Sequence, residues 1–126
     1  MLRPLSNSVA VKLPTRDVLI RRLGQIAKLI LDEFSEVEEV ILFGSLVRGD
    51  YGTDSDADIL LILDKSPYVR YFDRIPKYAP IFLDFYMPVD VFPYTKTEIE
   101  KMVENNNLFI KSMFDEGLSL GKKNDI

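Results

Sequence analysis

The sequence contains no cysteine and no histidine. Without cysteine, the chain has no disulfide bonds, no zinc–thiolate sites and no thiol nucleophile. Without histidine, it cannot use Ser-His-Asp hydrolysis, histidine metal sites or the commonest general base near neutral pH. The 20 aspartate and glutamate residues are therefore the obvious groups for chemistry.

Long hydrophobic runs are also missing. No apolar stretch approaches the roughly 18 residues that span a bilayer, and residues 1–17 lack the long apolar segment of a secretory signal. We therefore expect a cytoplasmic protein without a membrane partner. The net charge of −4 argues against a broad basic face that would bind duplex nucleic acid.

The composition is that of a globular protein, with 47% hydrophobic and 29% charged residues. A length of 126 residues suits one domain, which we expect to span residues 1–126. Residues 1–14 alternate in polarity and predict either an extra strand or an N-terminal arm. Residues 121–126 predict a polar tail.

Helical periodicity marks two parts of the chain. After Thr15, as N-cap, the spacing predicts an amphipathic helix of about five turns. Its apolar positions are Leu19, Leu23, Ile26, Ala27, Ile30 and Phe34. Further on, Thr95 and Glu98 form a capping-box pattern that predicts a helix to about Asn105. A last helix is predicted over residues 108–116, closed by Gly117.

Three segments have the composition of strands. Residues 40–43 are β-branched or aromatic and end at a glycine, which predicts a strand buried on both faces. The acidic residues 35–39 before it are interpreted as a solvated connection. A second strand is expected over residues 56–63 and a third, short one over residues 89–92 between two prolines.

Residues 68–87 do not predict one structure. Their apolar positions favour a helix, but Pro76 and Pro80 interrupt it. Residues 81–86 could instead be extended. We interpret the tyrosines and phenylalanines of residues 68–94 as core rather than as a base-stacking surface.

Asp56 and Asp58 open the second predicted strand. Because side chains alternate along a strand, both carboxylates point the same way, with Cα atoms about 7 Å apart, and can bind one divalent cation or two. With 12 aspartates in the chain, one Asp-x-Asp is expected by chance. An Asp-x-Asp preceded by Gly-Ser at the fixed distance seen here, with Gly44-Ser45 ahead of Asp56, is expected in only about one of 300 shuffled sequences.

The Gly44-Ser45 pair follows the first predicted strand. A glycine there lets backbone amides approach a phosphate closely, and Ser45 adds a hydroxyl donor. Arg48 could neutralise part of a triphosphate. The alternative is a plain strand-to-helix turn, with Ser45 as N-cap and Arg48 in solvent.

Asp90 is a third candidate acid, in an apolar strand where aspartate is uncommon. If this strand pairs with that of Asp56 and Asp58, the three carboxylates form a cluster. Such carboxylates repel one another unless a cation neutralises them. The alternative is a solvated residue at a sheet edge.

Together these motifs resemble the signature of the DNA polymerase β-like nucleotidyltransferases, and within that superfamily the minimal nucleotidyltransferases. The resemblance implies a small α/β (α+β) fold with a mixed sheet and helices packed on one side. It also implies that Asp56, Asp58 and Asp90 hold two Mg²⁺ ions, and that Ser45 grips the terminal phosphates of a nucleoside triphosphate. Asp90 would also help to deprotonate the hydroxyl that attacks the α-phosphorus.

The same resemblance implies a partner. Members of the family commonly occur as antitoxins beside a HEPN-domain toxin, and some transfer AMP from ATP to a tyrosine of that toxin. This is the leading hypothesis. Two alternatives stay open, a non-catalytic antitoxin that neutralises by complex formation and transfer to a small molecule. A homo-oligomer is also open.

Overall fold

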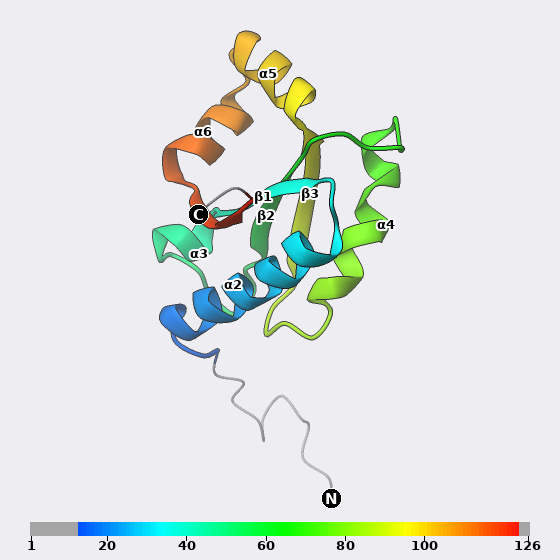
Figure 1. The fold of residues 1–126 in the computed structure, drawn as a ribbon. Helices are drawn as coiled ribbons and strands as arrows, with labels where there is room; N and C mark the ends of the chain where they lie inside the picture. The colour runs from blue at the N-terminus through cyan, green and yellow to red at the C-terminus, as the bar shows by residue number, and fades with distance from the viewer. Residues whose placement is uncertain (1–12, 124–126) are drawn as a thin grey trace, which may run out of the picture.

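A four-stranded mixed β-sheet forms the centre of residues 13–123, the part of the chain that the computed structural model describes (Figure 1). β1 (Val37–Phe43) pairs antiparallel with β2 (Ala57–Leu63) and with β4 (Leu118–Lys122). β3 (Val89–Thr95) runs parallel to β2, so the strand order is β3-β2-β1-β4. The mixed sheet predicted from the sequence is confirmed.

Helices lie before the first of these strands and between the strands along the chain. α2 (Arg16–Glu33) comes before β1, and the short α3 (Ser45–Arg48) follows it. α5 (Lys96–Glu104) and α6 (Leu108–Glu116) lie between β3 and β4. Three short turns of helix connect β2 to β3: η1 (Tyr71–Asp73), α4 (Ile75–Tyr78) and η2 (Ala79–Phe82).

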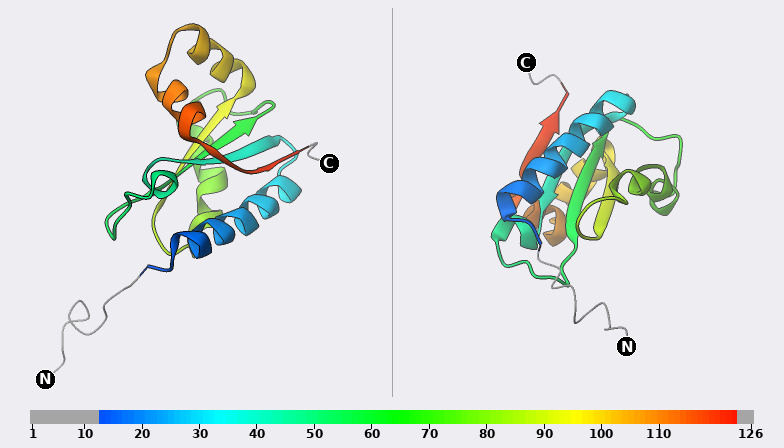
Figure 2. Two further views of the ribbon diagram at one scale, coloured as in Figure 1. Left: turned by 90° about the vertical axis from the view of Figure 1, so that its left-hand side faces the viewer. Right: turned by 90° about the horizontal axis from the view of Figure 1, so that it is seen from below.

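The helices cover both faces of the sheet rather than one. Val40 and Leu42 of β1 pack in a cluster with α2, whereas Ile41 belongs to a second cluster with residues of α5 and α6. Figure 2 (left) shows α2 below the sheet and α5 and α6 above it. The reason is that β1 and β2 are apolar on both faces, so each face must be buried. The implied packing on one side is therefore corrected.

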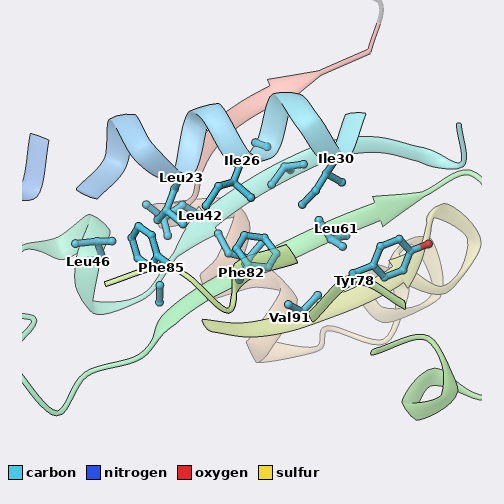
Figure 3. Packing of buried hydrophobic residues seen from close by; sticks show 14 of the residues in the cluster. Leu23, Ile26, Ile30, Leu42, Leu46, Leu61, Tyr78, Phe82, Phe85 and Val91 are labelled. Atoms are coloured by element: carbon cyan, nitrogen blue, oxygen red, sulfur yellow. The ribbon is translucent and has the colours of Figure 1, made fainter. Parts of the chain in front are cut away.

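The predicted amphipathic helix is confirmed as α2. Thr15 occupies its N-cap position, although the threonine side chain makes no capping hydrogen bond. The predicted apolar stripe is buried, and Figure 3 shows Leu23, Ile26 and Ile30 above Leu42 and Leu61 of the sheet. Phe34 ends the helix. This packing fixes one face of the strands that carry the candidate site.

Two strands are longer than predicted. β1 begins at Val37, which is fully buried, so only part of the acidic segment is a connection. Glu36 is held by the Tyr78 hydroxyl and by Lys77 Nζ, each 2.6 Å from its Oε2 atom. β3 continues through Pro93, which an edge strand tolerates because one side of its backbone has no strand partner.

Residues 68–87 contain turns of helix, so the extended alternative for residues 81–86 is wrong. Pro76 and Pro80 lie in the first positions of α4 and η2. At those positions a helix does not use the missing N–H. The prolines therefore begin helical turns here rather than interrupt one.

The C-terminal helices are confirmed, but the predicted tail is partly wrong. The capping box of Thr95 and Glu98 opens α5 with both of its hydrogen bonds, and Gly117 follows α6. The chain then forms β4, whose pairing with β1 runs from Leu118 to Lys122. The predicted strand or arm over residues 1–14 falls almost wholly on residues 1–12, which lie outside the described residues, as do residues 124–126. Within residues 13–123, no helix is long and apolar enough to cross a membrane.

The guanidinium of Arg74, only 3% exposed, ties the segment before β3 to the sheet. It donates to the carbonyl oxygens of Tyr68, Val69 and Pro93 and forms an ion pair with Glu98 at 2.6 Å. Arg74→Met should lower the free energy of unfolding by about 2–3 kcal/mol, because these buried acceptors lose their donor. Urea denaturation measures this.

Arg70→Met is the matched control for this variant. Arg70 pairs with Asp73 at the surface, and 82% of its side chain is exposed. Exposed ion pairs contribute little to stability, so Arg70→Met should lower the free energy of unfolding by less than about 1 kcal/mol. Equal losses in the two variants would contradict the anchoring role of Arg74.

Candidate functional site

A sharp turn at Gly44 joins β1 to α3. Gly44 has φ 84° and ψ −154°, a conformation open to glycine, and a Cβ atom there would collide with Asp58 Oδ2. The amides of Val47 and Arg48 both donate to the Gly44 carbonyl oxygen at 3.1 Å. Gly44 is itself the N-cap position, so the alternative with Ser45 as N-cap is wrong. The turn lies directly against an aspartate of the neighbouring strand.

The three predicted aspartates lie at one end of two adjacent strands. Asp58 of β2 is directly opposite Asp90 of β3 in the parallel register, which confirms the pairing that the cluster requires. Asp56 precedes β2 and is exposed, whereas Ala57 is fully buried. The alternation of side chains along β2 thus leaves Asp56 and Asp58 on the side away from Ala57.

The electrostatics of the aspartates reflect this proximity. Partial burial, followed by the charges of Asp90 and Asp56, raises the pKa of Asp58 to about 6. Partial burial also raises the pKa of Asp90, together with the charge of Asp56 and a hydrogen bond with its side chain. The neighbouring carboxylates therefore make ionisation of Asp58 and Asp90 harder.

The donor set suits a divalent cation, because carboxylate oxygens are the ligands that Mg²⁺ prefers. Within residues 13–123, no group of three Asp, Glu, His or Cys side chains lies close enough together to hold a metal ion. Asp58 and Asp90 are brought together by the sheet, and Asp56 flanks them. The assignment of these residues to a metal stays a prediction.

Arg48 does not lie free in solvent. Its guanidinium pairs with Asp50 at 3.2 Å and with both oxygens of Glu116 at 3.1 and 3.2 Å. Glu116 Oε1 also accepts the Gly44 amide hydrogen, with N and O 3.0 Å apart. The candidate phosphate-binding groups Gly44 and Arg48 thus share a carboxylate from the end of α6.

Sequence reasoning missed Glu116, which lies 72 residues from Gly44 along the chain. The sequence carried no specific signal for it. Glu116 is the last residue of α6, where the helix dipole disfavours a negative charge, but α2 and α5 also end in glutamates.

An open hollow of about 480 Å³ lies beside Asp90. Its walls include Tyr71, Phe72 and Tyr94, and the rings of Tyr71 and Tyr94 stack with centroids 4.6 Å apart. Phe72 is 77% exposed. The hollow gives the exposed side of Asp90 an aromatic wall.

A sequence model described as a nucleotidyltransferase domain matches residues 23–117, well over half of the chain. The chain belongs to the nucleotidyltransferase domain family. The matched range contains the Gly44 turn, the three aspartates and Glu116. A putative protein adenylyltransferase of Methanocaldococcus jannaschii is 41% identical to this chain over 44 residues. The matched region is 35% of this chain and 44% of that relative, so the chain matches less than half of the relative's length.

Two solved structures share the fold of this chain. A putative nucleotidyltransferase from Sulfolobus solfataricus superposes with a TM-score of 0.63 at 22% identity, covering 87% of this chain and 86% of that one. A toxin–antitoxin structure with AMP-PNP superposes with a TM-score of 0.53 at 20% identity, covering 80% and 73%. The nucleotidyltransferase fold implied by the sequence is confirmed.

Proposed function

We propose that this nucleotidyltransferase transfers AMP from ATP to a hydroxyl group of a protein, a tyrosine of a HEPN-domain toxin for which the chain is the antitoxin. One observation carries the proposal: the Gly44 turn abuts Asp58, which is in register with Asp90. The Gly44 turn, which is suited to binding phosphate, therefore lies next to carboxylates suited to binding a divalent cation. That juxtaposition is what a nucleoside triphosphate bound with its cation requires.

Asp56, Asp58 and Asp90 would hold Mg²⁺, with two ions expected. When bound, Mg²⁺ supplies positive charge that stabilises the entering and leaving oxygens of the transfer. The parallel pairing of β2 and β3 supports this assignment, because it sets Asp58 opposite Asp90. Their mutual repulsion favours binding of a cation.

The other residues would bind and orient the reactants. The Gly44 amide, the Ser45 hydroxyl and the Arg48 guanidinium would hold the terminal phosphates. The acceptor oxygen then attacks the α-phosphorus, the bond to the pyrophosphate oxygen breaks, and the hydroxyl proton passes to the Asp90 carboxylate. Asp90 is suited to this step because it is exposed on an edge strand.

The aromatic hollow beside Asp90 supports an aryl acceptor. Aromatic rings pack edge to face or offset against one another, so Tyr71, Phe72 and Tyr94 offer a surface for a tyrosine ring. The Methanocaldococcus relative, named a putative protein adenylyltransferase, and the toxin–antitoxin fold neighbour with AMP-PNP support a protein acceptor and an adenine nucleotide.

The proposal is tested with the purified chain, Mg²⁺, ATP labelled at the α-phosphate, and the cognate HEPN-domain toxin. Label should appear on that protein, and mass spectrometry should place it on a tyrosine. Asp56→Ala should give no label, whereas Asp54→Ala, which changes an exposed loop acid, should label normally.

Two results would count against this function. Equal absence of label with wild-type protein and Asp56→Ala would overturn it. If the toxin were nonetheless neutralised by both, complex formation would be the mode of action. Label on an added small molecule but not on the protein would assign a different acceptor.

A further inference from the structure

Glu116 occupies groups that a phosphate would use. Its carboxylate is held by the Gly44 amide at 3.0 Å and by Arg48 Nη1 at 3.1 and 3.2 Å. A backbone amide at a tight turn and a guanidinium are the usual partners of phosphate oxygens. The two carboxylate oxygens of Glu116 thus make the contacts expected of two phosphate oxygens.

The electrostatic surroundings of the Glu116 carboxylate are unfavourable apart from its contacts with Gly44 and Arg48. It lies at the negative end of α6, and its charge adds to the repulsion that raises the pKa of Asp58. The Glu116 side chain is 24% exposed, so it already borders solvent. The two groups at the turn are what hold it in place.

We propose that Glu116 competes with the nucleotide: it occupies the phosphate-binding groups of the free protein and leaves them when a nucleoside triphosphate binds. This inference rests on the proposed function and adds a regulation to the same site. Binding of the triphosphate must displace the carboxylate. The apparent association constant is therefore the intrinsic constant multiplied by the fraction of molecules in which the phosphate-binding groups are free.

The size of the effect follows from the exposure of the pair. Arg48 and Glu116 are partly exposed, with 48% and 24% of their side chains accessible. Such a pair stabilises the arrangement in which Glu116 occupies the phosphate-binding groups only modestly. Removing the competing charge should therefore tighten nucleotide binding by about three- to tenfold.

Glu116→Gln tests the inference in the full chain. Isothermal titration with a non-hydrolysable ATP analogue and Mg²⁺ should give a dissociation constant about three- to tenfold lower than that of the wild type. Glutamine keeps the size of the side chain but not its charge. Thermal unfolding without nucleotide checks that the variant is folded.

Asp115→Asn is the matched control, because it removes one negative charge from an exposed neighbour at the same helix end. Its affinity should stay within about twofold of the wild type, since a screened surface charge contributes little. Unchanged or weaker binding by Glu116→Gln, with binding by the wild type intact, would overturn the inference alone. Absence of nucleotide binding in all three proteins would overturn the proposed function as well.

Discussion

Asp58→Asn is expected to lower the rate of nucleotidyl transfer by about 10³-fold and to make the protein more stable at neutral pH. The rate falls because the variant loses the carboxylate that lies between the Gly44 turn and Asp90. Stability rises because the folded protein no longer holds a half-buried charge beside Asp56 and Asp90. Activity and folding should therefore respond in opposite directions.

The pKa of Asp58 determines whether the protein gains or loses stability as the pH rises. The pKa of Asp58 is raised from 3.8 to about 6 in the folded protein, so between these values the folded state binds more protons than the unfolded state. Stability is therefore lost as the pH rises through this window. With allowance for solvent screening, the loss amounts to about 1 kcal/mol at pH 7.

Urea denaturation at pH 5 and pH 7.5, without divalent cations, measures this loss. Asp58→Asn should lack the part of the pH dependence that comes from this residue. Adding Mg²⁺ should stabilise the wild type more than the variant, since a ligand stabilises the state that binds it. Identical pH profiles for the two proteins would contradict the electrostatic account.

The second large effect is expected for Gly44→Ala, which should lose about 2–4 kcal/mol of stability and about 100-fold in activity. The backbone at Gly44 has φ 84° and ψ −154°, where any side chain is strained. The new Cβ would also collide with Asp58 Oδ2. Displacement of Asp58 by as little as about 1 Å is enough for a loss of this size in activity.

Gly24→Ala provides the comparison for the same chemical change. Gly24 lies inside α2, and an added Cβ there meets no atom within 4 Å. Alanine favours the helix over glycine, so this variant should gain up to about 1 kcal/mol and keep its activity. Denaturation and transfer assays on both variants test the contrast, and equal behaviour would refute the steric argument.

Local signals in the sequence were sufficient to predict much of the fold. The 3.6-residue spacing of α2 and the capping box of α5 are properties of short segments, and the structure confirms both. The sequence left open whether the strand of Asp90 pairs with that of Asp58, and the parallel register of β2 and β3 sets the two residues opposite each other. The roles of these acids in catalysis stay predictions.

What the sequence did not reveal depends on contacts between distant segments. β4 consists of five residues without strong strand character, and it forms because the edge of β1 is available for pairing. Arg74 was not singled out, since its partners lie in the preceding loop, in β3 and in α5. Coverage of both faces of the sheet by helices could have been inferred, because the strand over residues 40–43 was predicted to be buried on both faces.

The pairing of β4 with β1 also determines where Glu116 lies. Only Gly117 separates Glu116 from Leu118, and Leu118 is held opposite Leu42, two residues before Gly44. The backbone hydrogen bonds of the sheet, rather than the length of α6, therefore set the distance from this carboxylate to the turn. A change of one residue in chain length at Gly117 would move Glu116 out of reach while leaving both strands and the helix intact.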